Sequence, residues 1–172
     1  MLEALIFIVF PFCMLFAAIS DMLSMTIANR VPLLLVGAFV AVAPLTGMDW
    51  ASFGLHLAAG AAVLVVTFGL FAVGGMGGGD AKLMAATAVW MGLSINLAQY
   101  LVVSAFFGGV LTLAILAFRG SALSVFTSRN MFLRHFADTT TGIPYGIALG
   151  IGGLLTYPDT PLVQWALARL AS

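Results

Sequence analysis

Long apolar segments with short polar connections dominate this sequence of 172 residues. Hydrophobic residues make up 63% of the chain and charged residues only 7%, so the predicted helices lack the charged face that a water-soluble protein presents. A helix crosses the apolar core of a bilayer with roughly 17 to 25 mostly apolar residues. The pattern therefore predicts an all-α, polytopic integral membrane protein.

About six segments fit membrane-spanning helices. We expect these helices over the ranges 2–20, 31–46, 53–73, 81–93, 97–118 and 142–157. The fourth and fifth come from one apolar stretch, 83–118, which would be about 54 Å long as a single helix. Because the apolar core of a bilayer is only about 30 Å thick, this stretch must fold back. The polar cluster just after Gly92 marks the turn.

The whole chain, residues 1–172, is expected to form a single transmembrane domain. Its first apolar segment follows Glu3 rather than basic residues, so we expect a retained helix and not a cleaved signal peptide. The net charge of zero gives no electrostatic basis for binding nucleic acid. The single cysteine, Cys13, has no partner for a disulfide or a cysteine-pair metal site. We expect no metal and no cofactor.

The lysine and arginine residues predict the orientation. When the connections are assigned alternately to the two sides of the membrane, all basic residues except Arg169 fall on one side: Arg30, Lys82, Arg119, Arg129 and Arg134. The positive-inside rule makes this side cytoplasmic and places the N-terminus outside the bacterial inner membrane. Aromatic residues near the opposite interface are expected to form a belt: Trp50, Trp90, Tyr100, Tyr157 and Trp165.

Two aspartates, Asp21 and Asp80, fall at the same cytoplasmic edge of the predicted bundle. A carboxylate at the edge of a bilayer is costly, so a functional role is the default interpretation. Asp80 could instead be the N-cap of the helix that follows it. Asp21 could be a solvated interfacial residue, or it could pair with Arg30 or Lys82. Two acids on one side predict an aspartyl protease acting in or at the membrane.

The segment before Asp80 contains five glycines, in Gly74-Gly75-Met76-Gly77-Gly78-Gly79. Glycine adopts backbone angles that are closed to other residues, and it lets another backbone approach closely. An ordinary connection between two helices does not need so many glycines. We expect this run to accommodate an extended peptide substrate.

These residues resemble the type IV prepilin peptidases, which are Gly-x-Gly-Asp aspartyl proteases of the inner membrane. The resemblance rests on Asp21 followed by Ile27 and Asn29, on Gly77-Gly78-Gly79-Asp80-Ala81-Lys82-Leu83, and on Ile143-Pro144-Tyr145-Gly146. It covers essentially the whole chain and implies that Asp21 and Asp80 are catalytic. It also implies that further residues shape the site: Gly77, Gly78, Gly79, Lys82, Asn29, Pro144, Tyr145 and Gly146. Without the resemblance, Lys82 would be interpreted as a side chain that snorkels to the lipid headgroups.

The expected substrate follows from the resemblance. The long members of the family carry a cytoplasmic insert with two Cys-x-x-Cys pairs and also N-methylate the cleaved pilin. This chain has one cysteine and no such insert, so it resembles the short branch that serves Flp-type (tight-adherence) type IV pili. Methyltransferase activity is not expected. The expected partners are an Flp-like prepilin or a pseudopilin, cut after a glycine, and the lipid bilayer. Archaeal preflagellin peptidases are an alternative short branch.

Two other classes of membrane protein stay open at this point. A small transporter or channel subunit would also contain glycine-broken helices and an acidic ion site, although near the middle of the membrane. An assembly subunit without catalysis would pair Asp21 with a basic residue. The polar stretch 121–141 is either a basic loop or an interfacial helix that gates the substrate.

Overall fold

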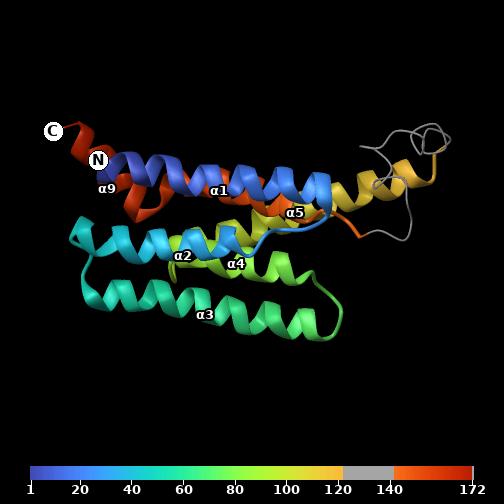
Figure 1. The fold of residues 1–172 in the computed structure, drawn as a ribbon, viewed down its shortest axis with the longest axis horizontal. Helices are drawn as coiled ribbons and strands as arrows, with labels where there is room; N and C mark the ends of the chain where they lie inside the picture. Colours follow the sequence, from blue (N-terminus) through green and yellow to red (C-terminus); the bar gives the residue numbers. More distant parts are fainter. Residues whose placement is uncertain (122–141, 172) are drawn as a thin grey trace.

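The computed structural model describes residues 1–121 and 142–171, and no strand occurs within these ranges. The predicted all-α class is therefore confirmed. The described elements are α1 (Leu2–Ser24), α2 (Arg30–Val42), α3 (Trp50–Ala72), α4 (Gly78–Met91), α5 (Ile95–Arg119), α8 (Gly146–Thr156) and α9 (Pro161–Leu170), with short 3-10 turns at Ala43–Thr46 and Tyr157–Asp159 (Figure 1). The predicted loop or interfacial helix at 121–141 lies almost entirely outside the described residues.

Among the described helices, α1, α3 and α5 are long and apolar enough to cross a membrane, with 23, 23 and 25 residues. Their mean hydropathy of 2.5, 2.1 and 2.4 is that of membrane spans. The helix α2 and its 3-10 turn form a shorter apolar helix over Arg30–Thr46. The chain is thus a polytopic membrane protein. The six predicted spans coincide with α1 to α5 and α8 to within about one helical turn at each end.

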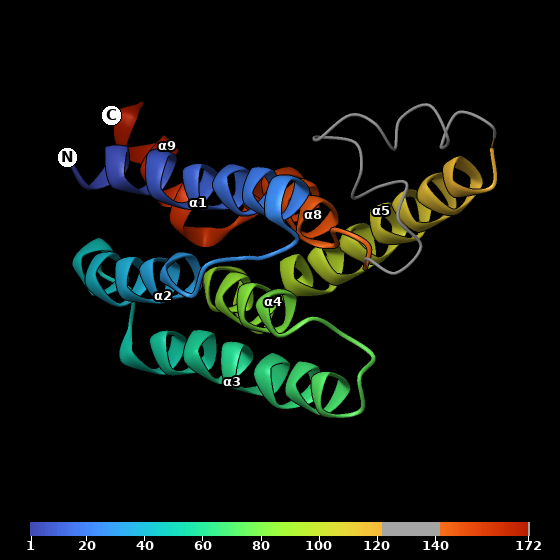
Figure 2. The ribbon, with the colours of Figure 1, turned by 45° about the vertical axis from the view of Figure 1, so that its right-hand side comes forward.

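The short helix α4 lies at the centre of the bundle and contacts α2, α3, α5 and α8 (Figure 2). With 14 residues it is about 21 Å long, which is less than the apolar thickness of a bilayer. Every residue from Ala85 to Met91 is buried. A helix that is apolar on all sides belongs inside a protein, so the neighbours of α4 enclose it and set its depth.

The turn between α4 and α5 forms where the sequence predicted it. Gly92 has a φ of 68°, a left-handed conformation that glycine adopts without steric cost. Ser94 then occupies the N-cap position of α5, and its side chain accepts a hydrogen bond from the backbone N–H of Asn96 at 3.2 Å. A hydroxyl at this position satisfies a helix N–H that has no partner within the helix.

Three of the five residues of the predicted aromatic belt are buried inside the protein and do not face lipid. Trp90 and Tyr100 are fully buried, and Tyr157 is 4% exposed. The Phe10 ring stacks on Tyr157 with the ring centroids 4.0 Å apart. The Trp90 indole and the Tyr157 hydroxyl each donate to a backbone carbonyl of another helix, at 2.9 and 2.8 Å. These bonds satisfy the polar atoms inside the core, whereas Trp50 is 77% exposed.

Glycines let α8 pack closely against its neighbours. A Cβ atom at Gly150 would lie 3.0 Å from the Cβ of Ala18 and 3.1 Å from the carbonyl oxygen of Met14, both in α1. On another face of α8, a Cβ atom at Gly152 would overlap the side chain of Ser104 in α5. Small residues permit this close approach of helices in membranes. They hold α8 between α1 and α5, with its N-terminus close to the C-terminal end of α1.

Candidate active site

Asp21 lies in the last turn of α1 and is 6% exposed. Its Oδ2 atom accepts a hydrogen bond of 2.7 Å from the backbone N–H of Gly146, the first residue of α8. The first N–H groups of a helix have no partner within the helix and favour an acceptor with negative charge. A Cβ atom at position 146 would lie 2.8 Å from this same Oδ2 atom. The glycine thus leaves the space that the Asp21 carboxylate occupies.

Asp80 is the third residue of α4, which begins at Gly78 with Gly77 in the N-cap position. The alternative that Asp80 is an N-cap is therefore wrong, because the helix starts two residues before it. The Asp80 side chain is half-buried, and among the described residues its carboxylate has no hydrogen-bond donor. Its position in the first turn still favours negative charge.

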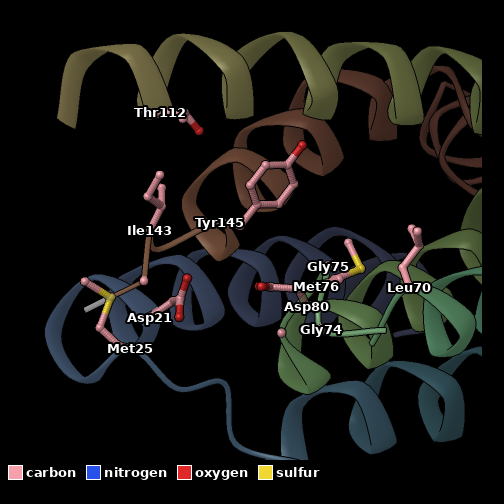
Figure 3. Close-up of a pocket in the computed structure, with 12 residues that line it drawn as sticks. Asp21, Met25, Leu70, Gly74, Gly75, Met76, Asp80, Thr112, Ile143 and Tyr145 are labelled. Atoms are coloured by element: carbon pink, nitrogen blue, oxygen red, sulfur yellow. The ribbon is translucent and has the colours of Figure 1, made fainter. Parts of the chain in front are cut away.

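The two carboxylates line one cavity of about 570 Å³ at the end of the bundle. Asp21 reaches the cavity from α1 and Asp80 from α4, and their carboxyl groups face each other (Figure 3). Within the described residues, the ion pairs involve only Glu3, so neither aspartate has a basic partner at salt-bridge distance. Arg30 and Lys82, which the sequence offered as possible partners of Asp21, do not pair with it.

A model of the type IV leader peptidase family matches residues 8–118, a range that includes both aspartates and the glycine run. The match spans well over half of the chain. The chain belongs to the type IV leader peptidase family. No curated protein and no solved structure matches it. Family membership favours a protease of the leader peptidase type over a transporter or an assembly subunit.

Two different properties of glycine account for the glycine run of this leader peptidase. Within it only Gly74 has a left-handed φ, of 77°. Gly77 has an extended backbone with φ −69° and ψ 140°, which any residue can adopt. Gly78 and Gly79 belong to the first turn of α4. Backbone freedom therefore explains only the start of the run.

Close packing explains the last three glycines. A Cβ atom at Gly77 would lie 2.8 Å from Oδ2 of Asp80. A Cβ atom at Gly78 would lie 3.1 Å from the ring of Phe71, and one at Gly79 would lie 3.2 Å from the Cβ of Ile27. The absence of a side chain thus leaves room for the Asp80 carboxylate and for the connection between α1 and α2.

Ile27 belongs to the site, although the resemblance assigned no role to it. It is 7% exposed. Its Cβ lies against Gly79 at the start of α4, and its Cδ1 would be 2.9 Å from a Cβ atom at Gly146 at the start of α8. One side chain therefore contacts both helix N-termini that border the aspartates. Its position after Asp21 was the only sequence signal for it.

Met25 is a cavity residue that the sequence did not indicate at all. It follows α1 with φ 53°, and its backbone N–H donates to the carbonyl oxygen of Asp21 at 2.9 Å. A left-handed φ is uncommon in a residue other than glycine and concentrates at functional sites. No sequence signal marks a methionine for this conformation.

The Pro144-Tyr145-Gly146 motif lies at the start of α8. Pro144 is buried, and Tyr145 lines the cavity opposite the aspartates (Figure 3). The Tyr145 ring packs directly over Gly108 of α5, where a Cβ atom would overlap it. Its hydroxyl donates to the carbonyl oxygen of Ser104 at 3.4 Å. The motif thus brings one aromatic wall of the cavity and the Gly146 N–H to the same place.

Asn29 and Lys82 lie together but outside the aspartate cavity. The Lys82 Nζ donates to Oδ1 of Asn29 at 2.9 Å, which joins the first turns of α2 and α4. Both residues line a separate cavity of about 350 Å³. The described residues contain no group of three or more His, Cys, Asp or Glu side chains that could hold a metal ion.

Proposed function

We propose that this protein is an aspartyl endopeptidase that removes the short basic leader of Flp-type prepilins or related pseudopilins. Asp21 and Asp80 form its catalytic pair, and no metal or other cofactor takes part. The observation that carries the proposal is the pair of carboxylates that face each other in one cavity without a basic partner among the described residues. The match to the leader peptidase family supplies the class of substrate.

The proposed mechanism uses one proton shared by the pair. Two carboxylates held close together do not both ionise readily, so one is protonated and the other is not. The ionised carboxylate takes a proton from a water molecule, whose oxygen attacks the scissile carbonyl carbon. The protonated carboxyl donates to the carbonyl oxygen. When the C–N bond breaks, a proton passes to the leaving amine, and the products are a carboxylate and a free N-terminus.

Either aspartate can take either role in this scheme. Asp21 faces the first N–H of α8 at 2.7 Å, and Asp80 lies in the first turn of α4, so a helix N-terminus favours negative charge at both. The titration then belongs to the pair and not to one residue.

The proposed orientation places this cavity at the cytoplasmic face of the inner membrane. The C-terminal ends of α1 and α5 and the N-terminal ends of α2 and α4 lie at one end of the bundle (Figure 1). Arg30, Lys82 and Arg119 are located at these helix ends. The chain N-terminus and Arg169 lie at the other end. By the positive-inside rule, the end with the aspartates faces the cytoplasm.

The cleavage position follows from the physical properties of a prepilin. Its basic leader stays in the cytoplasm, and its apolar helix satisfies its own backbone hydrogen bonds in the bilayer. The junction between them is the segment that can be extended and cut. A glycine just before the cut would let the backbone of the prepilin approach the two carboxylates closely. We also propose that the product is not methylated, since the short connection between α1 and α2 carries no Cys-x-x-Cys pair.

The test is cleavage of an Flp-type precursor by the purified protein in lipid vesicles, with the product sequenced. We expect one cut, after the glycine at the junction, with the apolar helix intact, and no loss of activity with a metal chelator. Asp49→Asn is the matched control for Asp21→Asn and Asp80→Asn, which should abolish cleavage. Asp49 lies away from the cavity, at the N-cap of α3, where its side chain accepts a hydrogen bond from the Ser52 N–H at 2.9 Å. Cleavage inside the apolar helix, loss on chelation, or activity only on a preflagellin would contradict the proposal.

A further inference from the structure

A second cavity, of about 420 Å³, continues from the one that holds the aspartates. The two cavities share three lining residues: Leu70, Met76 and Tyr145. In the close-up, Asp80 lies between Asp21 and Leu70, so the second cavity leaves the site on the side of Asp80 (Figure 3). An extended chain held at the aspartates can therefore continue into it.

The second cavity is a groove along α3, with α4 as its floor. Its α3 side consists of Ala62, Val63, Val66, Thr67 and Leu70, whose spacing places them on one face of the helix. This stripe is about 12 Å long. Met84 of α4 and Leu101 of α5 complete the groove. In the bundle, α4 lies between α3 and α5 (Figure 2). We call it the α3–α5 groove.

The α3–α5 groove offers an occupant apolar contact only. The Thr67 hydroxyl already donates to the carbonyl oxygen of Val63 at 2.8 Å and to that of Ala81 at 3.3 Å, and Thr67 is 3% exposed. Val66 and Leu70, in contrast, are 64% and 46% exposed. In a bilayer, helices associate mainly through van der Waals packing, so a protein partner would cover this apolar stripe by packing a helix against it.

We propose that the α3–α5 groove docks the first turns of the apolar helix of the prepilin, directly after the bond that is cut. This inference rests on the proposed function. The groove starts at the aspartates, where the junction must lie, and follows α3 away from its C-terminal end toward the interior of the bundle. The apolar helix that follows the junction must take the same direction, because its leader stays at the end with the aspartates.

Disulfide cross-linking tests this docking directly. Val66→Cys is compared with Val65→Cys, since both residues are exposed on α3, at 64% and 73%, but only Val66 lines the groove. Both variants carry Asp80→Asn, so that the precursor stays uncut, and Cys13→Ala. Single cysteines are placed along the first two turns of the precursor helix. We expect Val66→Cys to cross-link every third or fourth position, at least tenfold above Val65→Cys. Equal cross-linking at both positions, or none at Val66→Cys, would overturn the proposal.

Kinetics give an independent test that separates this inference from the proposed function. Filling the groove with Val66→Trp should raise the KM for the precursor by about tenfold and leave kcat nearly unchanged, whereas Val65→Trp should change neither. If the wild-type protein does not cut the precursor, the proposed function fails. If the wild type cuts it and the two tryptophan variants behave alike, the function stands and the groove proposal falls. The small cysteine variants decide the question if Val66→Trp does not fold.

Discussion

Replacing Gly146 with alanine should reduce turnover without unfolding the protein. The added Cβ atom would lie 2.8 Å from Oδ2 of Asp21, 2.9 Å from its Cβ, and 2.9 Å from Cδ1 of Ile27. The first of these contacts is about 0.6 Å shorter than the 3.4 Å at which ordinary contact begins. Asp21 therefore has to move, and the hydrogen bond of 2.7 Å from the Gly146 N–H lengthens or breaks.

The size of the effect follows from these two changes. A hydrogen bond to a charged group contributes about 1.5–3 kcal/mol, and a misplacement of about 1 Å in an active site costs about 100-fold in rate. We expect kcat to fall by about 10- to 100-fold, with a smaller change in KM, because substrate binding does not depend on this contact. Alanine has a higher helix propensity than glycine, so α8 itself should not be lost.

The assay is the rate of precursor cleavage in lipid vesicles, measured per folded molecule. Gly150→Ala is the matched control in the same helix: it crowds α1, 3.0 Å from the Cβ of Ala18, but does not touch Asp21. It should lower the unfolding temperature and leave kcat per folded molecule near the wild-type value. Gly109→Ala, whose new Cβ would meet no neighbouring residue within 4 Å, should change neither the unfolding temperature nor kcat. If folded Gly146→Ala keeps wild-type kcat, the assigned role of this glycine is wrong.

Three further outcomes are expected. Gly77→Ala should reduce kcat by about tenfold and leave stability unchanged, since its Cβ meets only the movable Asp80 carboxylate at 2.8 Å. In Gly78→Ala the new Cβ meets the Phe71 ring instead, so this variant should retain most of the wild-type rate. Equal losses of kcat in the two variants would argue against this account. A cysteine at Ser52 should react with an impermeant thiol reagent in intact cells and one at Ser121 should not, and the reverse pattern would invert the proposed orientation. Mass spectrometry of pilin processed by this protein alone should find an unmodified N-terminus; a methyl group that depends on this protein would refute that proposal.

The sequence was sufficient to predict six of the seven described α-helices, with their ends to within about one turn, but it did not predict α9 (Pro161–Leu170). Long apolar runs predicted α1, α3 and α5 directly, and the polar cluster after Gly92 located the turn before α5. These features depend on local composition, which is visible in the chain. The direction in which a side chain points is less visible: Trp90 and Tyr157 were expected at an interface, but both are buried and bonded to another helix.

The details of the site were less predictable, because they depend on contacts between distant segments. The bond from Gly146 to Asp21 joins residues 125 positions apart, and no local pattern reports it. The glycine run before Asp80 was expected to provide both unusual backbone angles and room for close approach. Its last glycines provide room, since Gly77 lies against the Asp80 carboxylate and Gly79 against Ile27. Only the packing of α4 against its neighbours distinguishes these two uses of glycine.

The central claim is that Asp21 and Asp80 act as one catalytic unit, and single-turnover kinetics of three variants test it most directly. Cleavage of the precursor is measured for Asp21→Asn, Asp80→Asn and the double variant, each at wild-type protein level. Residues that act as a unit have strongly non-additive effects. We predict that each single variant loses cleavage as completely as the double variant does. Substantial cleavage by either folded single variant, or losses that multiply in the double variant, would contradict a catalytic pair.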